Sequence, residues 1–138
     1  MHTAIATLKS VSIYSQNRYF PSEKEAKETH ADYEKRSWRK KLHTTDDGHV
    51  FIPPMAFKNC LSESAKYTSR QIPGKGKATY TKHIEAGVLV VEPLVLPILA
   101  KDVQSEVFFV PADGKRGSGK RVEKNYPIIP QWGGDVTF

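Results

Sequence analysis

The stretch DGHVFIPPMAFKNCLSESAKYTS, residues 47–69, predicts a turn, a short strand, a proline break and a helix in succession. It opens with an Asp-Gly dipeptide, which is typical of turns, and continues with four β-prone residues. Pro53 keeps Ile52 out of the helical conformation, whereas Pro54 suits a first helical turn, where its missing N–H costs nothing. We therefore expect a strand that leads directly into a helix over residues 54–68.

The expected helix is amphipathic. Apolar residues recur along it at three- and four-residue spacing and predict one packing stripe, which holds Ala56, Phe57, Cys60, Leu61 and Ala65. Cys60 is the chain's one cysteine, and its place on the stripe favours a small buried apolar residue over a nucleophile. Lys58 and Lys66 lie on another face, near the two ends of the helix.

The overall composition fits one domain over residues 1–138. Hydrophobic residues make up 38% of the 138-residue chain and charged residues 26%, which is typical of a globular protein. The formal net charge of +6 favours a polyanionic partner. A single cysteine excludes a disulfide within the chain, and no signal peptide or bilayer-length apolar run is evident. These features predict a soluble intracellular protein that has no contact with a membrane.

Four further strands are expected. Residues 3–14 alternate in polarity, and residues 86–96 are nearly all apolar, which favours a central strand that ends or bulges at Pro93. Residues 105–111 and 121–129 flank a glycine-rich loop and so predict a long hairpin.

A charged insertion or loop is expected at about residues 18–45, because the run 23–28 has mixed charges and almost nothing apolar. Two interpretations stay open for its second half. It could be a solvated helix packed through Tyr33, Trp38 and Leu42, or a basic aromatic surface for nucleic acid that includes Arg36 and Arg39.

Two basic glycine-rich loops carry the clearest functional signal. Glycines let backbone N–H groups approach a phosphate, and lysines and arginines neutralise it, so we expect recognition of a nucleic-acid backbone rather than of a base sequence. The alternative is a pair of solvated hairpin tips. The predicted nucleic-acid-binding residues are Arg70, Lys75, Lys77, Lys82, Lys115, Arg116, Lys120, Arg121 and Lys124 in and around the loops, with Lys58, Lys66, Arg36 and Arg39 elsewhere.

Other kinds of site are not supported by the sequence. The run Gly114 to Lys120 is similar to a phosphate-binding P-loop, but Arg121 replaces its Ser or Thr and a strand is expected to follow. The five histidines lack metal-ligand spacing. His43 or His49 could act as acid or base in a metal-free ribonuclease, although no partner constellation accompanies them. We therefore expect a non-enzymatic protein with no catalytic residue, metal or cofactor.

The order of the elements resembles a known family. A first strand reads ATLKSVSIYS, and a strand-to-helix segment reads VFIPPMAFKNCLSESAK. Together they resemble the RAMP superfamily of CRISPR-associated proteins, above all the subunit that polymerises along guide RNA as the backbone of effector complexes. That family carries an IPGSSLKGxLR-like motif, which Ile52-Pro53, Lys58 and Leu61 match. Pro54 and Asn59 stand where the family has glycines, Met55 and Ala56 where it has serines, and Ser62 where it has arginine.

The resemblance covers residues 4–17 and 47–69 and implies a ferredoxin-like (RRM-like) α+β fold. An antiparallel sheet would carry helices on one face and long basic hairpin loops. It also implies that Lys58 contacts RNA backbone, and that residues 115–124 form a thumb-like hairpin. The implied partners are RNA or another single-stranded nucleic acid and CRISPR effector subunits, with a homo-oligomer or filament as a further expectation. The implied location is the cytoplasm of a bacterium or of a phage-infected host.

Two roles fit this resemblance. The chain could be a reduced effector subunit, or a phage-encoded copy that acts as an anti-CRISPR by imitating one. From another class, the alternative is a small phage structural or assembly protein with its basic loops at subunit contacts. A metal-independent ribonuclease is the third hypothesis.

Overall fold

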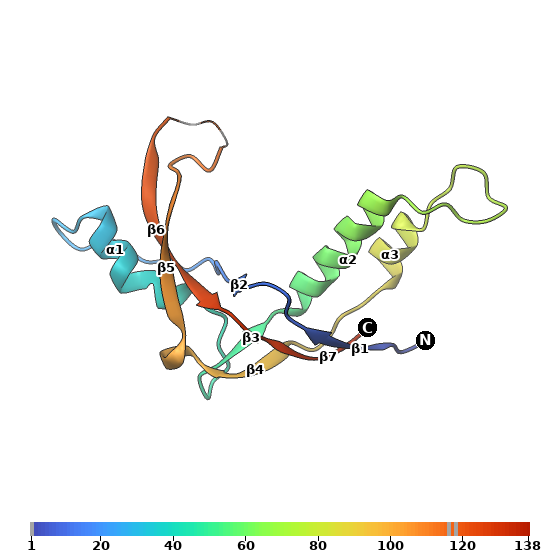
Figure 1. The fold of residues 1–138 in the computed structure, drawn as a ribbon, viewed down its shortest axis with the longest axis horizontal. Coiled ribbons are helices and arrows are strands. Elements are labelled where there is room, and N and C mark those ends of the chain that lie inside the picture. The colour runs from blue at the N-terminus through green and yellow to red at the C-terminus, as the bar shows by residue number, and fades with distance from the viewer. Residues whose placement is uncertain (1, 116, 118) are drawn as a thin grey trace. The chain divides into compact units, whose positions relative to one another are not determined.

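The computed structural model describes residues 2–115, 117 and 119–138 of the chain (Figure 1). It is a mixed α+β structure with antiparallel strand pairing, so the predicted fold class is confirmed at that level. In chain order the elements are β1 Ile5–Lys9, β2 Tyr14–Ser15, α1 His30–Ser37, the 3-10 helix η1 Trp38–Lys41, β3 His49–Ile52, α2 Pro54–Thr68, α3 Thr81–Gly87, β4 Leu94–Leu99, the 3-10 helix η2 Ala100–Asp102, β5 Gln104–Pro111, β6 Arg121–Ile129 and β7 Gly133–Thr137.

The strands form three small sheets, with strand orders β1-β7, β3-β4 and β2-β6-β5. The chain divides into two compact units. Unit 1 comprises Met1–Leu8, Phe51–Val95 and Gly133–Phe138, and unit 2 comprises Lys9–Val50 and Leu96–Trp132. The single domain with a charged insertion at about residues 18–45 stays a prediction.

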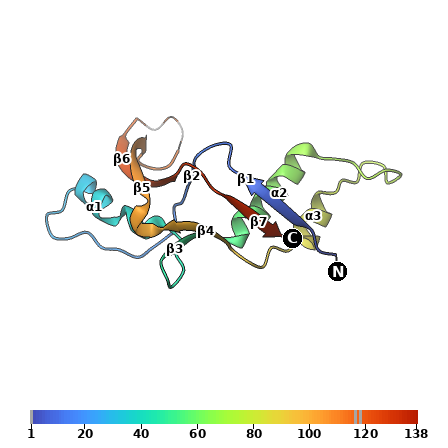
Figure 2. The ribbon, with the colours of Figure 1, turned by 60° about the horizontal axis from the view of Figure 1, so that its bottom comes forward.

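The helix predicted from the opening stretch is present in unit 1 with the predicted bounds, Pro54–Thr68. Pro54 stands in its first turn, and the helix ends at Ser69, whose left-handed backbone lets its N–H donate to the carbonyl of Ala65 at 3.1 Å. Figures 1 and 2 show α2 and α3 side by side.

The predicted packing stripe of α2 is narrower than its sequence indicates. Ala65 is buried, and Phe57 and Leu61 are half-buried, which marks one row of residues at four-residue spacing. Cys60 lies one position off this row and is exposed, so the prediction of a buried cysteine is wrong. The reason is geometric, because one neighbouring helix covers a row rather than a broad face.

The predicted strand at residues 86–96 is wrong over residues 86–93, and only its last part lies in a strand. The chain there completes α3 and then runs irregularly, and β4 begins only after Pro93. Leu89 and Val91 are 65% and 78% exposed, so the apolar run does not enter a sheet. Helix α3 is held at its end by Lys58, whose ammonium group donates to the carbonyls of Ile84 at 2.7 Å and Glu85 at 2.6 Å.

The first predicted strand, residues 3–14, is divided between two sheets. Its beginning pairs with the end of the chain, because Ala4 and Phe138 exchange both backbone hydrogen bonds, at 3.0 and 2.8 Å, the pattern of an antiparallel pair. Its end, Tyr14 and Ser15, pairs instead with β6.

Gly134 in β7 fits closely against the buried side chain of Leu94. Its φ of +144° disfavours any other residue, and an added Cβ would lie 2.7 Å from Leu94 Cδ1. We expect Gly134→Ala to lower the free energy of unfolding by about 2 kcal/mol through backbone strain and overpacking. Urea titration followed by circular dichroism measures this.

Gly87→Ala is the matched control. Gly87 ends α3, and an added Cβ there meets nothing within 4 Å. It should leave stability unchanged or raise it by up to about 1 kcal/mol. Equal midpoints for the Gly134 variant and the natural chain would contradict the close fit.

In unit 2, β5 and β6 form the long hairpin that the sequence predicts (Figure 1). They pair antiparallel from Gln104↔Ile128 at the base to Pro111↔Arg121 at the tip. Strand β2 adds to the far side of β6, so β5 lies at one edge of the three-stranded sheet.

Helix α1 lies within the predicted charged insertion and continues as the single turn η1. The Thr29 side chain caps α1 by accepting from the N–H of Asp32 at 3.2 Å. Of the predicted apolar side, Leu42 is buried, whereas Tyr33 and Trp38 are half-buried. The residues of α1 and η1 that are buried are polar: Glu34, Ser37 and Lys41.

These buried polar groups form one network with β6. Lys41 Nζ donates to Glu34 Oε2 and to the carbonyl of Asn125, both at 2.6 Å. The N–H of Asn125 donates to the same carboxylate oxygen at 3.1 Å. Lys41 Nζ also lies 4.6 Å from the centre of the Tyr126 ring. The network therefore joins α1 and η1 to the middle of β6 through a charge pair that is shielded from water.

Removing one member should be costly. We expect Lys41→Met to lower the free energy of unfolding by about 3–5 kcal/mol, because it leaves the carboxylate of Glu34 buried and unpaired. Lys40→Met is the control, since Lys40 is exposed in the same turn, and should change stability by less than about 0.5 kcal/mol. Chemical denaturation of both variants decides the point, and similar losses for the two would contradict it.

Candidate nucleic-acid interface

The tip of the β5–β6 hairpin is a basic turn in unit 2. The backbone closes it through Ala112 N–H to the Lys120 carbonyl at 2.9 Å and Gly114 N–H to the Pro111 carbonyl at 3.1 Å. Gly114 and Gly117 have φ of +72° and +86°, which explains why the loop is rich in glycine.

The predicted basic residues of this loop gather on and below the tip. Lys115, Lys120 and Arg121 are exposed, and Lys124 is half-buried and directly opposite Phe108. Arg121 Nη1 donates to the Phe109 carbonyl at 3.1 Å, which holds its guanidinium against the hairpin. Arg116 lies outside the described residues. The hairpin thus presents cationic side chains at positions that the pairing of β5 with β6 fixes.

Sequence reasoning missed the aromatic residues beside this charge. Phe109 is 61% exposed, and Phe108 is exposed with its ring centre 6.0 Å from that of Tyr126 in an edge-on arrangement. Successive strand residues point to opposite faces, so Phe108 and Phe109 lie on opposite faces of the hairpin. The sequence does contain a signal for this exposure, because a two-stranded hairpin cannot bury two consecutive aromatic residues. Taken as an apolar run, residues 105–111 predict only a strand.

The other predicted basic loop forms a small hairpin between α2 and α3 in unit 1. Ile72 N–H donates to the Ala78 carbonyl at 2.8 Å and Tyr80 N–H to the Arg70 carbonyl at 3.0 Å, while Gly74 and Gly76 take positive φ. The predicted residues here, Arg70, Lys75, Lys77 and Lys82, are all exposed, and none of them forms an ion pair with another described residue. Each unit therefore carries one basic hairpin of its own.

Two predicted lysines on α2 are engaged within unit 1. Lys58 binds the two α3 carbonyls given above, which are acceptors at the negative end of that helix. Lys66 pairs with Glu63 at 2.9 Å and Glu85 at 3.1 Å, and the hydrogen bonds to these carboxylates raise the pKa of Lys66. Both ammonium groups thus already have acceptors in the fold.

The predicted arginines of α1 and η1, Arg36 and Arg39, also have partners. Arg36 donates to both oxygens of Glu28, at 2.8 and 2.9 Å, and this lowers the pKa of Glu28 to about 2. The guanidinium of Arg39 stacks 4.2 Å from the centre of the Trp38 ring. The sequence thus placed a basic aromatic cluster here correctly, but its charges are largely satisfied by neighbouring side chains.

The two histidines considered for a ribonuclease, His43 and His49, have different surroundings. The Thr45 hydroxyl donates to Asp47, and Asp47 Oδ2 also accepts from His49 Nδ1 at 2.8 Å; both hydrogen bonds, the one from Thr45 first, lower the pKa of Asp47. Burial lowers the pKa of His43, and Arg18 adds to the effect. Within the part of the chain that the structure describes, no group of three His, Cys, Asp or Glu side chains could hold a metal ion.

Comparison of the chain with protein-family models, with curated proteins and with solved structures finds no match. Among the described residues, no helix has the length and apolar character needed to cross a membrane.

The position of Lys58 predicts a structural effect of its removal. We expect Lys58→Met to lower the free energy of unfolding by about 1–3 kcal/mol, because two charged hydrogen bonds to the end of α3 are lost. Lys82→Met, an exposed change within α3, should cost less than about 0.5 kcal/mol. Thermal melts of the two variants give the comparison. An unchanged melting temperature for the Lys58 variant would show that its hydrogen bonds to the α3 carbonyls do not stabilise the fold.

Proposed function

We propose that this chain binds single-stranded RNA by contacting the phosphates of the RNA backbone, and that it is not an enzyme. One observation carries the proposal: exposed Phe108 and Phe109 lie directly below a basic glycine-rich tip on the same hairpin. Cationic side chains attract a polyanion, and aromatic rings give unpaired bases a surface on which to stack. A duplex hides its bases, so this combination favours a single strand.

The resemblance to the RAMP superfamily supports the choice of RNA. Its strand-to-helix motif corresponds to the step from β3 through Pro53 into α2. On this proposal the fold is ferredoxin-like, the hairpin is the thumb, and the chain works in a CRISPR effector complex or as an anti-CRISPR mimic against one. Purified effector subunits mixed with the tagged chain test this part, since failure to co-purify with them would contradict it.

The phosphate contacts predict a steep salt dependence. For a single-stranded oligonucleotide, each neutralised phosphate contributes about −0.7 to the slope of log K against log salt concentration. We expect Lys115→Ala with Lys124→Ala to weaken binding of a fluorescent RNA 20-mer and to reduce the magnitude of the slope by about 1.4. Anisotropy titrations between low and moderate salt measure both quantities.

Lys35→Ala with Lys40→Ala is the matched control for that experiment. Both residues are exposed, one in α1 and one in η1, and the pair removes the same charge outside the two strands and the tip of the hairpin. Equal slopes for the two double variants would show that net charge, not the hairpin, sets the affinity. Absence of RNA binding by the natural chain at low salt would overturn the proposal altogether.

Stacking predicts a separate, salt-independent loss. Phe109→Ala should weaken RNA binding about 5- to 150-fold, the range for the loss of one stacked base, with the salt slope unchanged. Val107→Ala on the same face of β5 is the control for strand packing and should have little effect on affinity. Light scattering after nuclease treatment tests the structural-protein alternative, which requires an oligomer that is stable without nucleic acid.

A further inference from the structure

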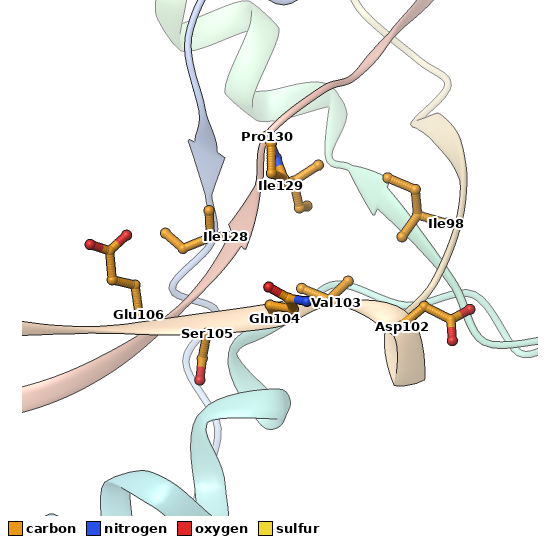
Figure 3. A pocket seen from close by; sticks show the side chains of 9 residues that line it. All are labelled: Ile98, Asp102, Val103, Gln104, Ser105, Glu106, Ile128, Ile129 and Pro130. Carbon is orange, nitrogen blue, oxygen red and sulfur yellow. The ribbon is translucent and has the colours of Figure 1, made fainter.

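The base of the β5–β6 hairpin holds a pocket of about 450 Å³ in unit 2. Apolar side chains line it, among them Val103 and Ile129, which are buried, and Ile98 and Ile128, which are half-buried. Figure 3 shows these side chains gathered around the hollow, with the carboxylates of Asp102 and Glu106 to either side. The pocket is thus apolar inside and acidic at its margins.

The pocket lies against the edge of a sheet. Gln104 pairs with Ile128 and Glu106 with Tyr126, so these side chains share one face of the hairpin. Ser105 points to the other side of β5 in Figure 3. Strand β5 lies at the end of the order β2-β6-β5, so its outer row of backbone N–H and C=O groups is not paired within that sheet.

Two carboxylates that pair with no described residue stand at the margins of this pocket. Asp102 and Glu106 are exposed, and among the described residues neither side chain has a hydrogen bond or an ion pair. They stand in a chain whose net charge is +6. Carboxylates repel phosphates, so this end of the hairpin does not extend the basic surface at its tip.

We propose that the β5 edge and this pocket bind an extended segment of a partner protein in which an apolar residue has a lysine or arginine two positions away on each side. The segment adds to β5 as a further strand, by backbone hydrogen bonds. Alternate side chains of a strand point the same way, so the apolar residue enters the pocket and the two basic residues lie on the same face. The flanking basic side chains meet Asp102 and Glu106, and this charge complementarity selects the partner.

A heptapeptide of sequence Thr-Arg-Thr-Val-Thr-Arg-Thr, acetylated, amidated and fluorescently labelled, is the probe, because its valine and both arginines share one face of a strand. We expect it to bind the full chain and to shift the backbone amide signals of residues 103–107 and 128–129 in NMR spectra. Asp102→Asn with Glu106→Gln should weaken binding about fivefold or more, the effect of two lost charge contacts. Asp113→Asn with Glu123→Gln removes equal charge nearer the tip and should leave affinity unchanged.

Two altered peptides test the mode of binding. The same sequence with every backbone nitrogen methylated should not bind, because it cannot donate to a strand edge, and one with glutamate in place of both arginines should be repelled. Failure of the parent peptide to bind, or equal affinity for the pocket variant and the tip variant, would overturn the proposal. Shifts of the same amides with protein concentration or with RNA would also overturn it, in favour of a second copy or of nucleic acid.

This inference does not rest on RNA binding. The Asp102/Glu106 variant should bind the RNA 20-mer as tightly as the natural chain. Loss of peptide binding with RNA binding intact, or the reverse, therefore assigns a failure to one proposal or the other.

Discussion

The buried charge pair of Lys41 and Glu34 is the constraint on which the arrangement of unit 2 depends. Both residues are only 5% exposed. On β6, the carbonyl of Asn125 accepts from Lys41 and its N–H donates to Glu34. Burying two charges removes their hydration, and the attraction between them offsets that cost only when the remaining hydrogen bonds are made. The network therefore favours one placement of α1 and η1 on β6, since a slip of one residue would move the N–H and the C=O of Asn125 away from both charges.

The placement of α1 and η1 matters because β6 pairs with β5 to form the hairpin. Its register with β5 sets which residues share a face, and so brings Phe108 opposite Lys124 near the tip and Glu106 opposite Tyr126 nearer the base. One hairpin thus presents aromatic rings and more cations than acids near its tip, and two carboxylates stand beside an apolar pocket at its base. The separation of charge along a single element gives the two ends different chemical preferences, one for phosphate and one for basic side chains.

Local signals explain what could be predicted. Helix α2 follows from two prolines and a four-residue apolar spacing, which act within a few residues of each other. The strands β5 and β6 follow from apolar runs on both sides of a glycine-rich loop. The residues 86–92 show the limit, because a short apolar run has no periodicity that distinguishes a strand from an exposed stretch. Lys58 shows another limit, since its two acceptors lie 26 and 27 positions away in α3.

By itself, the sequence determined the α+β class, the bounds of α2 and the β5–β6 hairpin, because each depends on residues that are neighbours in the chain. Only the tertiary structure decided which charges remain available. It placed Lys58, Lys66 and Arg36 against acceptors, buried Lys41, and left Asp102 and Glu106 beside an apolar pocket. The physical reason is that whether a charged side chain can bind a ligand depends on the groups around it in space, and most of those come from distant parts of the chain.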